Sequence, residues 1–146
     1  MYTEGVVIYI SPFYFKNGNT SKNKYFVVLK VVDNQIVIAS LPTSSNKTPS
    51  LIQTEHGCNN DPERCFNCYA FQAGRVIADN GFSFPKNTYV YGNEVEDYLL
   101  QTLQLNYKIE GVDYEIMGTL TKQEYAALSE CLKQSTSIRR GLKKYL

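Results

Sequence analysis

The strongest hydrophobic pattern in the chain is a pair of apolar runs, residues 25–32 and 35–41, separated by Asp33 and Asn34. Asp and Asn tolerate the positive φ of tight hairpin turns, so the two runs are predicted to be the strands of a β-hairpin. Both runs are almost continuously apolar rather than alternating, which is typical of strands buried on both faces. The pattern therefore predicts a hairpin in a small closed barrel or in a sheet under a helix.

Shorter strands are predicted where β-branched and aromatic residues cluster or alternate with polar ones, at residues 5–11, 68–77, 88–91 and 112–116. A further short strand is expected at 50–55. Residues 57–64 (GCNNDPER) are expected to form a turn-rich excursion, because Gly, Asn, Asp and Pro favour turns.

Helical periodicity is clearest after Thr121. Thr121 and Glu124 have the spacing of a capping box, in which each side chain satisfies a backbone N–H at the start of a helix. Apolar side chains follow at helical spacing, at Tyr125, Leu128 and Leu132. A helical stripe also runs through 138–146, and 94–105 fits a helix less well. Together the elements predict a mainly β (α+β) fold, a small barrel with a C-terminal helix and one further helical segment.

Composition adds limits on domain number and partners. The 146 residues are 43% hydrophobic and 13% aromatic, which predicts a single globular domain over 1–146 with a real core. The formal net charge is only +1, so affinity for nucleic acid has to come from local patches. The basic segment 138–146 is interpreted as a surface helix with a solvated polar face, although phosphate binding is the alternative.

The N-terminus (MYTEGVVIYISPFYF) has no positively charged stretch before its apolar part, and the longest apolar run is far shorter than a membrane span of about eighteen residues. The sequence therefore predicts neither a secretory signal nor a membrane segment, and a cytoplasmic location is expected.

The only histidine lies beside three of the four cysteines, in the order His56, Cys58, Cys65 and Cys68. Zinc takes four nitrogen or sulfur ligands in a tetrahedron, and a pair spaced as Cys65 and Cys68 is frequent in structural zinc sites. A structural zinc site at these four residues is one hypothesis. The favoured interpretation is that the cysteines are free thiols, buried or kept reduced, rather than disulfide-bonded.

Several enzyme classes are excluded by what the sequence lacks. Because the one histidine lies in the cysteine cluster, no Ser-His-Asp set can be assembled. No glycine-rich phosphate-binding loop of standard spacing occurs either.

Three segments carry a resemblance to a known family. Residues 23–29 (NKYFVVL) are similar to a family strand that opens with arginine and proline, and residues 37–44 (VIASLPTS) to its next strand, which ends in threonine. Residues 118–132 (GTLTKQEYAALSECL) are similar to the entry into the last family helix. In order and spacing these segments resemble the PemK/MazF-like toxins of toxin–antitoxin systems.

The resemblance implies an SH3-like barrel that acts as a homodimer and cleaves single-stranded RNA without a cofactor. It also implies an antitoxin protein that occupies the RNA groove. The family arginine falls on Lys24 and the family threonine on Thr43, which implies that these residues flank the scissile phosphate. A lysine offers a point charge where arginine offers a planar fork, and Tyr25 replaces the family proline.

The same resemblance suggests further RNA contacts. Four residues lie on two polar loops that a hairpin barrel would bring to one rim, and these are Lys16, Lys22, Ser44 and Lys47. The chemistry needs no metal, because the 2′-hydroxyl of the RNA attacks the phosphorus and the protein stabilises the charge that develops.

Other interpretations of the same residues stay open. The position of Thr43 is also typical of a hydroxyl that caps a turn at the end of a strand. The position of Lys24 is also typical of a cation that shields an aggregation-prone strand. On the scale of the whole chain, the alternatives are a non-catalytic module that binds RNA or protein on the same barrel, and a zinc-stabilised interaction domain.

Overall fold

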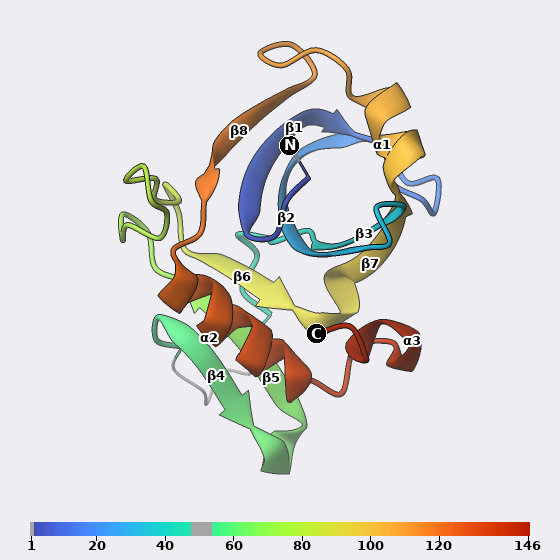
Figure 1. Ribbon diagram of the computed structural model, residues 1–146. Helices are drawn as coiled ribbons and strands as arrows, with labels where there is room; N and C mark the ends of the chain where they lie inside the picture. The colour runs from blue at the N-terminus through green and yellow to red at the C-terminus, as the bar shows by residue number, and fades with distance from the viewer. Residues whose placement is uncertain (1, 48–53) are drawn as a thin grey trace.

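The computed structural model describes residues 2–47 and 54–146 and shows a mainly β, α+β architecture with two antiparallel sheets (Figure 1). The larger sheet has the order β7-β3-β2-β1-β8. Its strands are β1 (Val6–Phe13), β2 (Lys22–Val32), β3 (Ile36–Ser40), β7 (Val95–Leu99) and β8 (Tyr114–Thr119). The smaller sheet has the order β4-β5-β6, formed by β4 (Gly57–Asp61), β5 (Phe66–Phe71) and β6 (Thr88–Tyr91). The helices are α1 (Leu100–Asn106), α2 (Lys122–Lys133) and α3 (Arg140–Lys143).

The hairpin predicted from the hydrophobic pattern is confirmed as β2 and β3. Asp33 and Asn34 between the strands have φ of 52° and 55°, the left-handed conformation that such turns require. Within the ladder, Val27 lies opposite Ser40. The strand predicted at 88–91 is present with the same bounds, and the helix after Thr121 is present as α2. The strands predicted at 5–11 and 112–116 are present with shifted ends, and the strand predicted at 68–77 ends already at Phe71.

Both faces of β2 are buried, as its continuous apolarity predicts. Phe26 and Val28 belong to one apolar cluster, with residues of β1, β3 and α1. Val27 and Leu29 point to the opposite face and join a second cluster, which also contains residues of β5, α2 and α3. The larger sheet therefore curves around one cluster, with α1 alongside, and packs its other face against the smaller sheet and α2 (Figure 1).

The larger sheet does not close. Its edge strands β7 and β8 do not pair with each other in the part of the chain that the structure describes. A mainly β fold is therefore established, whereas the closed barrel is not.

Two segments differ from their predictions. Residues 57–64 contain strand β4, because pairing with β5 and packing against α2 override the poor strand propensity of Gly and Asn. Residues 94–105 divide into β7 and α1, where the backbone N–H of Leu100 bonds the carbonyl of Gln35. The strand expected at 50–55 falls mainly outside the described residues, and residues 54 and 55 are not in a strand.

None of the helices in the described ranges has the length and apolarity needed to cross a membrane.

Close packing occurs where the chain between α2 and α3 meets Gly92. A Cβ atom at Gly92 would meet Oγ of Ser135 and would lie 3.0 Å from Cγ1 of Ile138.

We expect Gly92→Ala to lower the free energy of unfolding by about 1–3 kcal/mol, because an added methyl group overpacks this contact. Gly141→Ala is the matched control, since a Cβ at Gly141 meets nothing within 4 Å and alanine favours the helix. Urea unfolding of both variants makes the comparison. Equal stabilities would show that the chain after α2 does not pack on Gly92 as described.

Candidate functional site

The pairing of β2 with β3 brings Lys24 beside Thr43. Val27 lies opposite Ser40 in the antiparallel pairing. Lys24 comes three residues before Val27 and Thr43 three residues after Ser40, so these two residues also face each other. The Lys24 ammonium donates a hydrogen bond of 3.2 Å to the backbone oxygen of Pro42. The two residues that the resemblance assigns to the scissile phosphate are therefore close together across the hairpin.

Thr43 joins the two sheets. Its backbone exchanges two hydrogen bonds with Tyr89 of β6, 2.9 Å from Thr43 N to Tyr89 O and 2.7 Å from Tyr89 N to Thr43 O. The Thr43 hydroxyl accepts a hydrogen bond of 3.1 Å from the backbone N–H of Ser45, as turn hydroxyls do. An accepting hydroxyl still has its own proton to donate, so the turn role and phosphate binding are compatible.

Charged side chains surround this junction. Lys47 forms an ion pair of 3.1 Å with Glu94, and its backbone N–H donates a 2.8 Å hydrogen bond to the Tyr91 hydroxyl. Burial lowers the pKa of the half-buried Lys24; Glu94 opposes this shift, whereas Lys22 and Lys47 add to it. A lowered pKa makes the Lys24 ammonium a better proton donor than an exposed lysine.

The other predicted RNA contacts are only partly gathered here. Ser44 is exposed directly after Thr43, and Lys22 is exposed at the start of β2. Lys16 is engaged with β7 instead, because its ammonium donates a 2.6 Å hydrogen bond to the backbone oxygen of Asp97 and lies 3.6 Å from the Glu96 carboxylate.

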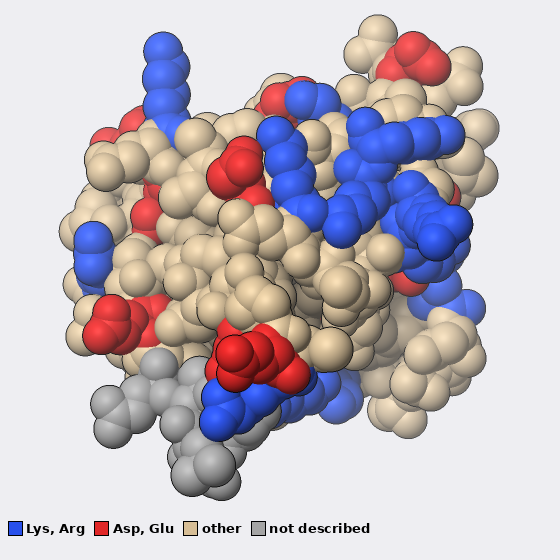
Figure 2. Space-filling model, turned by 90° about the horizontal axis from the view of Figure 1, so that it is seen from below, with Lys and Arg blue, Asp and Glu red and all other residues tan. Residues whose placement is uncertain are grey.

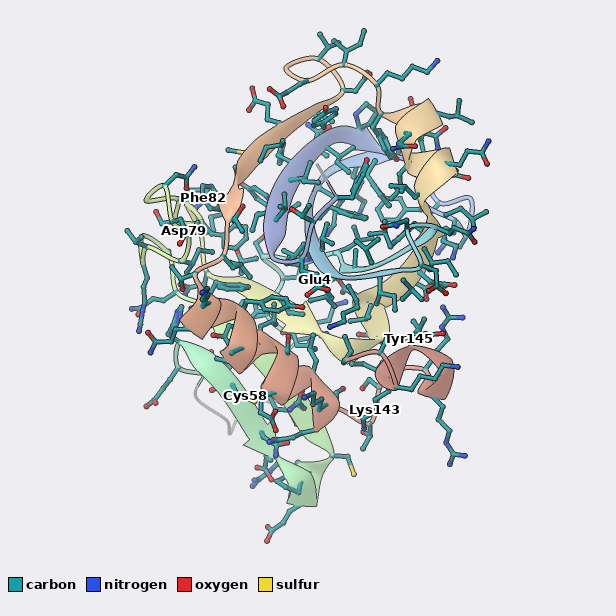
Figure 3. The ribbon with its side chains drawn as sticks, viewed as in Figure 1. Glu4, Cys58, Asp79, Phe82, Lys143 and Tyr145 are labelled. Atoms are coloured by element: carbon teal, nitrogen blue, oxygen red, sulfur yellow. A yellow bond between two sulfur atoms is a disulfide. The ribbon has the colours of Figure 1, made fainter. Side chains whose placement is uncertain are left out.

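The zinc hypothesis is not supported by the positions of its four residues. Cys58 lies on β4 beside α2 (Figure 3). It forms a disulfide with Cys131 on α2, so its sulfur is not a thiolate ligand. Cys68 is buried on the face of β5 away from Cys58, and Cys65 is exposed in the turn between β4 and β5. Within the described residues, no three His, Cys, Asp or Glu side chains come together as metal ligands.

The prediction of free thiols in the cluster is therefore confirmed for Cys65 and Cys68 and wrong for Cys58. Cys65 and Cys68 are free, but Cys58 and Cys131 are not. Local sequence patterns do not indicate a bond between two cysteines that are 73 residues apart, because such a bond depends on how α2 packs on the smaller sheet. Burial raises the pKa of the Cys68 thiol to about 11, which makes it unreactive at neutral pH.

His56 takes part in a partly buried polar cluster that the sequence did not predict. Its Nε2 bonds the Glu124 carboxylate, and its Nδ1 accepts a 3.0 Å hydrogen bond from the backbone N–H of Gln72. The Tyr69 hydroxyl donates to Oε2 of Glu124 at 3.2 Å. Because both ring nitrogens are engaged, His56 connects the smaller sheet to α2 and is not available as a base or metal ligand.

The predicted capping box forms only in part for the same reason. The Thr121 hydroxyl accepts a 3.2 Å hydrogen bond from the backbone N–H of Glu124, as predicted. The Glu124 carboxylate does not turn back to the helix start, because it bonds His56 and Tyr69.

Lys and Arg side chains gather on the side of the molecule where α3 lies (Figure 2). Arg139 pairs with Asp97 at 2.7 Å and with Glu96 at 3.2 Å, and Lys143 donates a 2.8 Å hydrogen bond to the backbone oxygen of Ser135. These intramolecular partners agree with the interpretation of this segment as a surface helix.

No protein-family model, curated protein or solved structure matches the chain. The functional assignment therefore depends on the residues of the site itself.

The cysteine arrangement predicts a specific pattern of thiol reactivity with Ellman's reagent. In the folded protein one thiol, Cys65, reacts fast, because Cys68 is buried. Denaturation without reductant exposes two thiols, and denaturation with reductant exposes all four. Cys65→Ser should remove only the fast reaction. Four reactive thiols without reductant would contradict the disulfide.

We expect Glu124→Ala to cost about 1–3 kcal/mol of unfolding free energy, because it leaves the partly buried His56 ring and Tyr69 hydroxyl without their acceptor. Glu130→Ala on the exposed side of the same helix is the control and should cost less than about 1 kcal/mol. Chemical unfolding of both variants tests this, and equal losses would show that the buried cluster contributes no stability.

Proposed function

We propose that this protein is a metal-independent endoribonuclease that cleaves single-stranded RNA with a sequence preference, as the resemblance to the PemK/MazF-like toxins implies. The observation that carries the proposal is the position of the Lys24 ammonium beside the Pro42–Thr43 peptide. This position brings together a cation from the start of β2 and a hydroxyl three residues after the end of β3.

In the proposed reaction, the RNA 2′-hydroxyl gives its proton to solvent water and attacks the adjacent phosphorus, and the 5′-oxygen of the next nucleotide leaves with a proton. The products are a 2′,3′-cyclic phosphate and a free 5′-hydroxyl. Lys24 stabilises the negative charge of the phosphorane, and the Thr43 hydroxyl donates a hydrogen bond to a non-bridging oxygen. The lowered pKa of Lys24 also suits it to protonate the leaving oxygen.

The proposal extends to architecture and partners. The curved larger sheet, wrapped around the cluster that contains Phe26 and Val28, is interpreted as an SH3-like barrel with its edges unpaired. The active form is a homodimer, and an antitoxin protein neutralises it by covering the surface around Lys24 and Thr43.

A second candidate is a non-catalytic RNA-binding module on the same fold. The observation that favours it is that Lys24 is already hydrogen-bonded to Pro42, and the Thr43 hydroxyl to Ser45. Binding through Lys22, Lys24 and Lys47 needs only charge, whereas catalysis needs their precise geometry.

The proposed RNA substrate implies a cytoplasmic location. The Cys58–Cys131 disulfide is an argument against it, because such bonds are rare in reducing compartments. The redox state of this bond, measured in protein isolated under thiol-blocking conditions, decides between a reducing and an oxidising location. A reduced pair of cysteines agrees with the cytoplasm, and an intact disulfide contradicts it.

We expect Thr43→Val and Lys24→Gln each to lower the rate of RNA cleavage by about 10²–10³-fold, the usual loss when one transition-state donor is removed. Lys24→Arg keeps the charge that stabilises the phosphorane but does not give up a proton, so it should cleave more slowly than wild type and faster than Lys24→Gln. The assay follows a mixed-sequence single-stranded RNA in EDTA.

Lys108→Gln, on an exposed loop after α1, is the control for loss of positive charge and should cleave like wild type. If wild-type protein binds RNA without cutting it, and Lys24→Gln weakens that binding, the binding module is the correct account. Unchanged cleavage in both Thr43→Val and Lys24→Gln would refute the site.

A further inference from the structure

A hollow of about 260 Å³ lies between α1, β7 and the chain that follows β1. Its floor consists of buried rings, those of Phe13, Tyr98 and Tyr107. The rings of Phe13 and Tyr107 are nearly parallel, at 14° with centroids 6.0 Å apart, whereas Tyr98 meets Phe13 edge-on at 84°. The hollow therefore has an aromatic floor of defined geometry.

Two large apolar side chains at the mouth of this hollow are exposed to solvent. Tyr14 is 56% exposed and Leu99 is 61% exposed. The Tyr14 ring lies parallel to Tyr107, at 11° with centroids 6.1 Å apart, and the backbone N–H of Tyr14 donates to the Tyr107 hydroxyl at 2.9 Å. Tyr14 is thus held in place on one face and leaves its remaining surface open to a ligand.

Polar groups without partners lie on the rim. Thr102 and Asn106 are four residues apart on α1, so they share one side of the helix, and both line the hollow. Neither side chain forms a hydrogen bond with another residue among those described. An asparagine amide presents a donor and an acceptor side by side, which matches the hydrogen-bonding edge of a nucleobase.

We propose that this hollow binds a nucleobase, with Tyr14 and Leu99 against the faces of the base and Asn106 and Thr102 at its edge. A flat heteroaromatic ring meets both features of the hollow, since it combines apolar faces with a polar edge. An aliphatic ligand would leave the rim groups unpaired.

The charges near the hollow favour a base over a phosphate. The only cation of its lining, Lys16, is neutralised by Asp97 and Glu96, at 3.4 and 3.6 Å. Its ammonium lies 5.3 Å from the centre of the Tyr98 ring, where it closes one side of the hollow. The same two carboxylates also pair with Arg139, so the lining offers a phosphate no unpaired cation, whereas an uncharged base needs none.

This inference goes beyond the proposed RNA cleavage, because it requires neither Lys24 nor Thr43. The base can belong to a free nucleoside or to a single-stranded RNA, and the chemistry of recognition is the same. The two sources are distinguished by the probes.

The test is a titration of the ¹⁵N-labelled full chain, followed by amide chemical shifts, with adenosine, guanosine, cytidine, uridine and a mixed-sequence hexaribonucleotide as separate probes. We expect saturable shifts at 13–16 and 97–107 with at least one nucleoside, or with the hexaribonucleotide alone if the base belongs to RNA. Tyr14→Ala should weaken the binding at least about tenfold. Asn106→Ala should reduce the preference among bases.

Val112→Ala is the matched control, because Val112 is also an exposed apolar residue, at 67%, but does not line the hollow. Lys24→Gln should leave nucleoside binding unchanged, so failure of the cleavage proposal and failure of this one are separable. The inference is wrong if no probe shifts these residues, if Tyr14→Ala binds like wild type while its spectrum stays folded, or if N-acetylphenylalaninamide binds as tightly as the nucleosides.

Discussion

Burial of β2 on both faces is the constraint on which the rest of the structure depends. Phe26 and Val28 serve one apolar cluster, and Val27 and Leu29 serve the other. Because both faces are apolar, alternation alone does not fix the register between β2 and β3. The positive φ angles of Asp33 and Asn34 define the turn and the pairing next to it, from Val32–Ile36 to Lys30–Ile38. An irregularity between Val28 and Lys30 then shifts the pairing by one residue, so that Val27 lies opposite Ser40.

The shifted pairing brings Lys24 opposite Thr43 and places the candidate site at the start of β2, where the apolar residues give way to lysines. The site then depends on the smaller sheet as well, because Tyr89 of β6 holds the backbone of Thr43. That sheet is tied to α2 by the Cys58–Cys131 disulfide and by the bond between His56 and Glu124. The disulfide, the buried polar cluster and the sheet junction therefore all act on the geometry around Thr43.

The parts of this architecture that were predictable from sequence are those with a local cause. The hairpin turn and the Thr121 cap each follow from residues within a few positions of one another. Strand β4 and the Cys58–Cys131 bond were not predictable, because they depend on packing between segments far apart in sequence. The resemblance located Lys24 and Thr43 but not Glu94 and the β6 tyrosines around them, since the contact between β3 and β6 has no local signal.

The central claim is that Lys24 and Thr43 act together on one phosphate of an RNA strand. The most direct measurement is the chemical identity of the ends that wild-type protein leaves on single-stranded RNA in EDTA. The account predicts discrete cuts that carry a 2′,3′-cyclic phosphate on one fragment and a 5′-hydroxyl on the other, since only the RNA's own hydroxyl attacks. Fragments with a 5′-phosphate and a 3′-hydroxyl, or RNA that stays intact, would contradict it.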